Sequence, residues 1–235
     1  FANNLRLATD DQTRSRMAYL AARENQRMGK QAIAQAMLQM VQASHPNYPE
    51  AKALEGVVLS LQKRYTDAIV PLQIALAVGK AAGRDAQFVN TVQMNIARAY
   101  YAAGNYPKAA EYWAGIPRED PLWLQAQFER SWAHFRMSDM AGTLALLQNH
   151  ESPYFQDLYY PEASLLRIYA LFLLCKFPDA SAQIETFQTR YGAQHSQLMG
   201  LAAQPPEALF SAMRTHVESG TSDLPPSVAA AFATE

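Results

Sequence analysis

The sequence predicts an all-α protein, a solenoid of about five helical hairpins followed by a further helical segment. Three observations predict this fold class. Small, aromatic, glycine and proline residues recur at fixed offsets along the chain. Within each recurrence the apolar residues stand three and four positions apart, which places them on one face of a helix. A single hairpin of this kind cannot bury that face alone, so successive hairpins must stack on one another.

The composition suits one extended domain with a sizeable core. The chain has 235 residues, of which 49% are hydrophobic and 17% are charged, as in folded proteins. Its 20 basic and 21 acidic residues give a net charge of −1, which provides no field for gathering nucleic acid. No run of about 18 uncharged apolar residues occurs, the length that a membrane helix needs. We therefore expect no nucleic-acid partner and no direct membrane span in this sequence.

The recurring pattern is clearest in residues 97–113, which read ARAYYAAGNYPKAAEYW. Its spaced positions are Ala97, Tyr100, Gly104, Tyr106, Ala109 and Trp113. Gly104 and Asn105 stand where one short helix ends and the next begins. With Asn90 as position 1, Ala97 is position 8, Gly104 is position 15 and Ala109 is position 20. We expect alanine and glycine at positions 8 and 20 to let two helices approach closely.

Five repeats with this pattern start near residues 15, 49, 90, 124 and 161. The first matches at Ala22, Gly29, Ala34 and Pro46. The second and the fifth both open with the tripeptide PEA, and the fourth has only small residues at the small positions. The starts are 34, 41, 34 and 37 residues apart. The longest interval predicts a longer hairpin around residues 78–89, with Asp85 as a helix N-cap.

The two ends of the chain depart from the pattern. Residues 1–14 form an N-terminal leader, and residues 192–235 form a C-terminal helical segment that we expect to cap the last repeat and to continue beyond Glu235. Within it we expect a helix with Pro206 at its start, Glu207 in its first turn and Gly220 just after its end.

A period of 34 residues with these offsets resembles the tetratricopeptide repeat family. The resemblance covers about residues 15–191. It implies a right-handed superhelical solenoid whose first helices line a concave groove, chiefly through positions 2, 5, 9, 12 and 13 of each repeat. It also implies a non-catalytic scaffold or adaptor that binds a protein or peptide partner. The alternative is a structural spacer or self-assembly module that uses its convex or terminal surfaces.

Counting those positions along this sequence gives a candidate partner-binding groove. Its residues are Arg16, Arg23, Arg27, Arg98, Tyr101, Phe128, Trp132, Phe135, Arg136, Tyr169 and Phe172. The groove is basic near its N-terminal end and aromatic in its C-terminal half, so it matches a peptide with an acidic end and apolar anchors. The alternative for the aromatic residues is burial against the second helices or under the C-terminal segment.

Two further features of the resemblance limit the kind of partner and the cellular setting that we expect. Some members of the family hold a chaperone tail with a lysine at position 5 and an asparagine at position 9. In the third repeat of this chain Met94 and Arg98 stand there instead, so a chaperone co-factor role is not expected. Repeats four and five also resemble, faintly, repeat proteins of the bacterial cell envelope. This resemblance favours the periplasmic or cell-envelope side and an envelope or motility assembly.

The sequence holds little that could carry catalysis. It lacks the usual phosphate-loop, serine-hydrolase and zinc-protease motifs. Five histidines are scattered without the spacing of a metal site, at His45, His134, His150, His195 and His216. Cys175 stands alone at position 15, where we expect a buried structural thiol. We therefore expect no catalytic residue, no metal, no cofactor and no enzyme activity.

Overall fold

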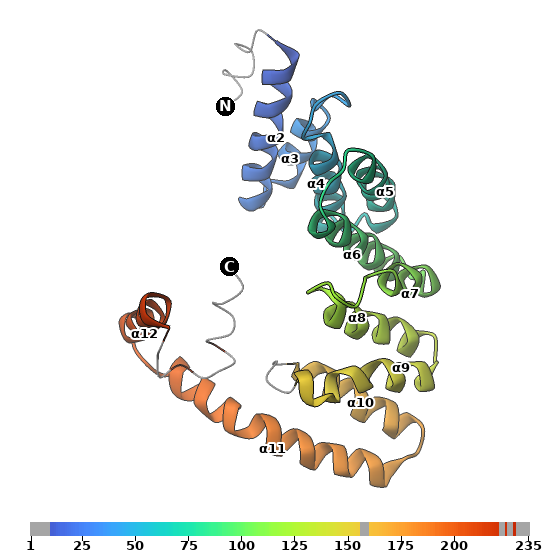
Figure 1. Cartoon of the computed structure of the whole chain (residues 1–235), viewed down its shortest axis with the longest axis vertical. Helices are drawn as coiled ribbons and strands as arrows, with labels where there is room; N and C mark the ends of the chain where they lie inside the picture. The colour runs from blue at the N-terminus through green and yellow to red at the C-terminus, as the bar shows by residue number, and fades with distance from the viewer. Residues whose placement is uncertain (1–9, 156–159, 221–223, 225–227, 229–235) are drawn as a thin grey trace. The chain divides into compact units, whose positions relative to one another are not determined.

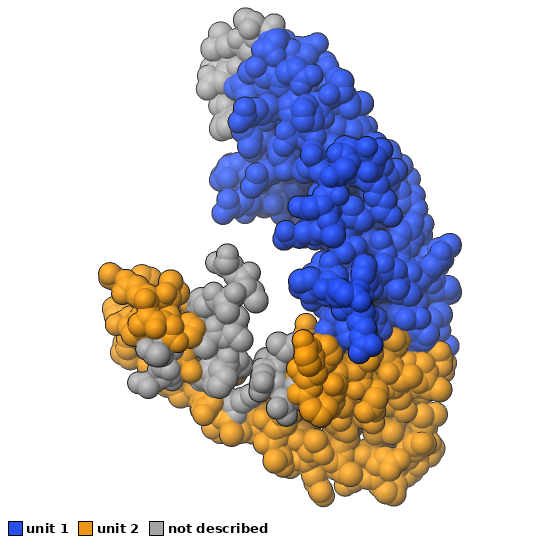
Figure 2. All heavy atoms as spheres, viewed as in Figure 1, with its two compact units in different colours: residues 1–137 blue, residues 138–235 orange. Residues whose placement is uncertain are grey.

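The computed structural model describes residues 10–155, 160–220, 224 and 228 (Figure 1). Among these residues the regular secondary structure is entirely helical, and no strand occurs. The predicted all-α class is therefore confirmed. The chain divides into two compact units, Phe1–Met137 and Ser138–Glu235 (Figure 2).

Unit 1 is a stack of paired helices. They are α2 (Asp11–Arg27), α3 (Gln31–Leu38), α4 (Tyr48–Leu61), α5 (Tyr65–Ala81), α6 (Ala86–Ala102), α7 (Tyr106–Ala114) and α8 (Trp123–Arg136). Each helix packs against the next one in the chain, and α2 also contacts α4, as α4 does α6. In Figure 1, α2, α4, α6 and α8 lie along one side of this unit, and α3, α5 and α7 along the other. We call the even-numbered set the first helices.

Small residues let these helices approach closely. Ala22, Ala97 and Ala109 are fully buried, and each stands at position 8 or 20 of its repeat. At Gly56, also position 8, a Cβ atom would lie only 2.3 Å from Cγ of Leu72 on the facing helix α5. A larger side chain there would force α4 and α5 apart.

A residue in the left-handed region follows each of the helices α2, α4, α6, α8 and α10 (Pro161–Leu173). The φ angles are 73° at Gly29, 62° at Lys63, 82° at Gly104, 59° at Ser138 and 55° at Cys175. Counted from the five expected starts, each of these residues is position 15. This regularity supports the repeat boundaries, which stay a prediction.

The expected burial of Cys175 is wrong, because its side chain is exposed. Position 15 lies in the turn, outside the faces that two helices press together, and a left-handed residue reverses the chain there. The sulfur therefore points away from the core.

The longer hairpin of the second repeat ends where the sequence predicts. Asp85 adopts extended backbone angles, and its side chain accepts a hydrogen bond of 2.8 Å from the backbone N–H of Phe88. The N-cap is therefore confirmed. The additional residues lengthen α5 to Ala81 and let α6 begin at Ala86, so they extend the two helices rather than form a linker.

Unit 2 holds the remaining helices. They are α9 (Met140–Leu147), the 3-10 helices η1 (Gln148–Glu151) and η2 (Pro153–Phe155), α10 (Pro161–Leu173), α11 (Phe177–Ala202) and α12 (Pro206–Ser219). Helix α10 packs against both α9 and α11. None of the helices that the structure describes is both long and apolar enough to cross a membrane.

The C-terminal segment follows the expectation in part. Helix α12 begins at Pro206, carries Glu207 in its first turn and ends at Gly220, whose φ is 70°, as predicted. However, α11 runs without a break through the boundary expected at residue 192, because a lone glycine costs a helix only about 1 kcal/mol. Residues 1–9 of the expected leader and residues 229–235 lie outside the described residues. The capping role stays a prediction.

Candidate functional site

The predicted groove residues lie on four helices. Within unit 1, α2 carries Arg16, Arg23 and Arg27, α6 carries Arg98 and Tyr101, and α8 carries Phe128, Trp132, Phe135 and Arg136. Within unit 2, α10 carries Tyr169 and Phe172. We call the side of unit 1 that presents positions 2, 5, 9, 12 and 13 of α2, α4, α6 and α8 the first-helix face. Two pockets take walls from these positions.

The aromatic pocket lies among α6, α7 and α8. It has a volume of about 430 Å³ and is lined by Arg98, Tyr101, Trp113, Glu129 and Trp132. Three of these side chains, Arg98, Tyr101 and Trp132, are among the predicted groove residues. The structure thus brings together predicted residues from two repeats.

Glu129 organises this pocket. Its carboxylate accepts a hydrogen bond of 2.8 Å from Nε of Arg98 and a second one from Nη2 of the same side chain. It also accepts hydrogen bonds of 3.1 Å from Nε1 of Trp113 and 3.0 Å from Nε2 of Gln125. The side chain of Glu129 is only 17% exposed. Hydrogen bonding to Glu129 raises the pKa of Arg98, so the guanidinium stays charged.

Aromatic rings form the rest of the wall. The Tyr101 ring lies 5.9 Å from the Trp113 ring and 5.3 Å from the Tyr106 ring, between centroids. The guanidinium of Arg136 lies 4.8 Å above the Tyr106 ring, a favourable cation–π distance. Burial raises the pKa of Tyr101, although the charge of Arg136 acts in the opposite direction. The pocket therefore presents neutral aromatic rings around a satisfied ion pair, which suits an apolar or aromatic guest.

The remaining aromatic residues divide between the two units. Phe128, Trp132 and Phe135 are half-buried in unit 1, and the rings of Trp132 and Phe135 lie 5.7 Å apart. On α10 of unit 2, Tyr169 is 62% exposed and Phe172 is 56% exposed. The three rings on α8 are therefore held by packing and remain partly accessible to a ligand. The two rings on α10 are mostly exposed.

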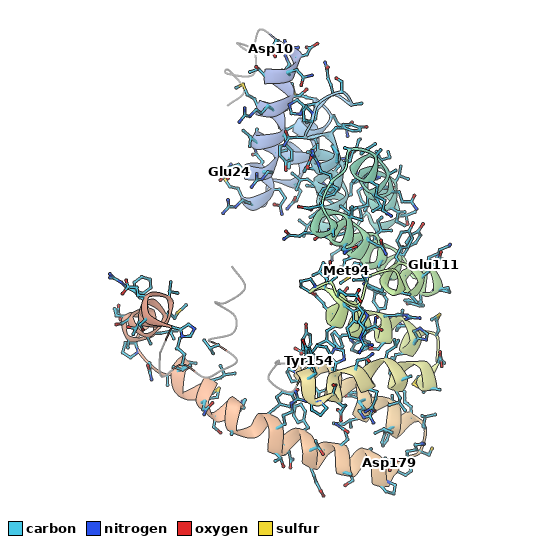
Figure 3. The ribbon with its side chains drawn as sticks, in the orientation of Figure 1. Asp10, Glu24, Met94, Glu111, Tyr154 and Asp179 are labelled. Carbon is cyan, nitrogen blue, oxygen red and sulfur yellow. The ribbon has the colours of Figure 1, made fainter. Side chains whose placement is uncertain are left out.

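One position of the expected groove belongs to the core instead. Met94, at position 5 of the third repeat, is 1% exposed and packs among buried residues that include Ala97 and Trp113. Figure 3 labels Met94 on α6 and Glu111 on α7. Glu111, unlike Met94, is exposed. Met94 faces inward because α6 must fill the space beside the small residues of its own hairpin.

Reasoning from the sequence missed two pocket residues, Trp113 and Glu129. Trp113 is one of the regularly spaced apolar residues that are expected to face the core, and it is only 2% exposed, yet it also lines the pocket. Glu129 is at position 6, outside the expected inward positions. The sequence did hold a signal for Glu129. Arg98 and Glu129 are 31 residues apart, which is the repeat length of 34 residues minus about one helical turn. Opposite charges at that offset can face each other across neighbouring first helices.

The basic pocket lies between α2 and the turn that precedes α4. Its volume is about 460 Å³, and its walls include Arg16, Tyr19, Arg23 and His45. The guanidinium of Arg23 lies 5.9 Å from the centre of the Tyr19 ring. Nδ1 of His45 accepts a hydrogen bond of 3.1 Å from the backbone N–H of Asn47. Arg27, in the last turn of α2, is exposed and lines neither pocket.

Metal-binding groups do not gather in the part of the chain that the structure describes. No set of three or more His, Cys, Asp or Glu side chains there is arranged to hold a metal ion. Both pockets include arginine and aromatic side chains in their walls.

Similarity to known proteins exists at the level of structure. No protein-family model matches the sequence, and no curated protein does. A solved structure of MamA from Desulfovibrio magneticus RS-1 matches with a TM-score of 0.65 at 12% identity, over 80% of this chain and 99% of that one. The TPR-like repeats of a Podosopora anserina protein described as a kinesin light chain match with a TM-score of 0.61 at 18% identity, over 80% of this chain and 100% of that one. BtubC from P. vanneervenii matches with a TM-score of 0.59 at 12% identity, over 79% of this chain and 82% of that one. The predicted resemblance is thereby confirmed for the fold, which is a tetratricopeptide-like helical solenoid.

Proposed function

We propose that this tetratricopeptide-like solenoid is a non-catalytic scaffold or adaptor that binds a peptide or protein partner on its first-helix face. The aromatic pocket is the observation that carries the proposal. It is a preformed hollow of about 430 Å³, and Tyr101, Trp113 and Trp132 supply the side-chain types that dominate protein interfaces. An apolar side chain of the partner would fill it.

Preorganisation makes this pocket suitable for binding. The hydrogen bonds to Glu129 already fix Arg98 and Trp113, so a partner need not pay the entropy of ordering them. Each Å² of apolar surface that the guest buries contributes about 25 cal/mol. A single aromatic anchor can therefore supply a large part of the affinity.

The other predicted groove residues are further candidate contacts, each within its own unit. In unit 1, Phe128, Phe135 and Arg136 lie on α8, the helix that carries Trp132. In unit 2, Tyr169 and Phe172 offer exposed rings on α10. A setting in a bacterial envelope or motility assembly belongs to the proposal as well, and the resemblance of repeats four and five is its only support.

Selection of peptides from a random displayed library on the whole chain tests the proposal. The selected peptides are then titrated against wild type, Trp132→Ala and Val70→Ala. Val70 is the matched control, since it is an exposed apolar residue on the second helix α5. We expect Trp132→Ala to weaken binding by at least about 2 kcal/mol and Val70→Ala to leave it unchanged, with both variants folded by circular dichroism.

Equal affinity of the selected peptides for wild type and Trp132→Ala would contradict the proposal. The partner surface would then lie elsewhere, and the structural-spacer reading would gain support.

A second candidate, self-assembly, is favoured by one observation on unit 2. Four neighbouring apolar residues on α10, which we call the α10 ridge, are largely exposed: Leu165, Tyr169, Phe172 and Leu173. Their spacing of four, three and one places them on one helix face, and exposed apolar patches mark interaction sites. Sedimentation over a wide range of protein concentration tests this candidate. A mass that rises with concentration in wild type and not in Phe172→Glu would support it.

A further inference from the structure

We infer that the basic pocket of α2 is a second subsite, which binds the carboxylates of an acidic segment of the same peptide partner. The inference rests on the proposed function, because it concerns the same first-helix face. Among the residues that the structure describes, none of the nine that line the pocket is acidic, although the chain as a whole is nearly neutral. The pocket therefore concentrates positive charge locally.

Two guanidinium groups provide that charge. Arg16 and Arg23 stand seven positions apart on α2, about two turns, with Tyr19 between them on the same face. Within the described residues, neighbouring arginines are engaged by carboxylates: Arg14 lies 2.9 Å from Asp11, and Arg84 lies 2.7 Å from Glu50. No such ion pair forms at Arg16 or Arg23 among the residues described. Their planar groups can thus pair with incoming carboxylates, bidentately where the geometry allows.

His45 adds a donor at the other wall of the pocket. The residue is 6% exposed, and its Nδ1 accepts a hydrogen bond from the backbone N–H of Asn47. The ring hydrogen of the neutral imidazole must therefore be on Nε2. The ring is held by the turn before α4, so its orientation does not depend on a ligand.

The carboxylates near the pocket are already committed. Glu50 is close enough that its charge raises the pKa of Tyr19, an effect secondary to burial, yet its own partner is Arg84. Asp10 caps α2 by accepting the backbone N–H of Thr13 at 2.8 Å. Neither acid forms an ion pair with Arg16 or Arg23, so the positive field faces the open pocket.

A peptide ligand fits this site better than nucleic acid does. The chain has 20 basic and 21 acidic residues and a net charge of −1, so it provides no overall field that would gather a phosphate backbone. Because Arg16 and Arg23 are exposed, salt should weaken the interaction.

Titration of the isotope-labelled whole chain with a capped peptide of glutamate and aspartate tests the inference. The readout is the arginine Nε–H and histidine ring signals in nuclear magnetic resonance spectra. We expect saturable shifts at Arg16, Arg23 and His45, and none from a capped lysine peptide of the same length. Arg23→Gln and Arg16→Gln should each weaken binding by about threefold to fivefold. Arg64→Gln, at an exposed ion pair with Asp67 on another helix, is the matched control and should have no effect.

The possible failures can be told apart. Absence of shifts at Arg16 and Arg23, or equal shifts from inorganic phosphate, would overturn the inference. Trp132→Ala should bind the acidic peptide as wild type does, because the aromatic pocket lies on other helices. If the acidic peptide binds while Trp132→Ala retains full affinity for the library-selected peptides, the subsite stands and the proposed function fails.

Discussion

Glu129 receives hydrogen bonds from four donor atoms that three helices supply. Two of them belong to Arg98 on α6, one to Trp113 on α7 and one to Gln125 on α8. The carboxylate thereby ties together the walls of the aromatic pocket. Arg98 and Trp132 were predictable as inward residues because repeat offsets fix their positions. The repeat offsets did not identify Glu129, because it is at position 6, outside the expected inward positions, and its only sequence signal is its 31-residue separation from Arg98.

Glu129→Ala should destabilise the fold by about 1–3 kcal/mol, because Nε1 of buried Trp113 would lose its acceptor. Chemical denaturation measures this loss. Glu111→Ala is the control, since its ion pair with Lys108 is exposed on both sides and should contribute less than about 1 kcal/mol. Equal losses in the two variants would show that Glu129 is an ordinary surface acid.

Tyr101→Phe should change the response of stability to alkaline pH. Burial raises the pKa of Tyr101 in the folded state above its unfolded value of about 10. A raised folded pKa contributes stability below the unfolded pKa, and this contribution is lost as pH rises through the folded pKa. Wild type should therefore lose more stability above about pH 10 than the variant does in denaturation series at several pH values. Parallel curves would refute the assignment.

At the scale of elements, the turns were easier to foresee than the lengths of the helices. The glycines at positions 29 and 104 predicted a turn from the sequence. Lys63 and Cys175 adopt the same left-handed conformation although each carries a Cβ atom. Stacked neighbours impose the reversal at position 15 whatever residue stands there. At Gly192 the prediction was wrong in the opposite direction. The glycine indicated a helix end, yet it lies inside α11. No proline or left-handed residue accompanies it there.

Gly104→Ala and Gly192→Ala should therefore change stability in opposite directions. Neither added Cβ would meet an atom within 4 Å, so backbone conformation alone decides the sign. Gly104 has a φ of 82°, where an alanine costs about 1 kcal/mol. Gly192 is helical, and alanine there should stabilise by up to about 1 kcal/mol. Denaturant titrations that give the same sign for both variants would contradict these conformations.

At the scale of the whole molecule, the repeat pattern was sufficient for the fold class and insufficient for the pockets. Periodicity reports which side chains face the core, and the confirmed tetratricopeptide-like fold follows from that. A pocket instead depends on where three helices leave space unfilled, as at Trp113 and Trp132. That space is set by side-chain packing between repeats, which a single repeat does not encode.

The two pockets together predict a spacing within the ligand. Adjacent packed helices lie about 8–10 Å apart, so two steps along the first helices, from α2 to the pocket among α6, α7 and α8, span about 20 Å. An extended peptide covers this distance in about six residues. Synthetic peptides with an acidic pair and a tryptophan separated by about six residues should bind more tightly than peptides in which the two are adjacent. Isothermal titration of both series measures the difference, and equal affinities would show that the pockets do not share one ligand.

Photo-cross-linking tests most directly whether a peptide lies on the first-helix face. Benzoylphenylalanine is placed at Phe135, beside Trp132, or at Val70 on α5 as the control, and each chain is irradiated with a library-selected peptide. We expect a cross-linked product from position 135, suppressed by excess unlabelled peptide, and none from position 70. A product from position 70 alone, or equal products from both positions, would contradict this expectation.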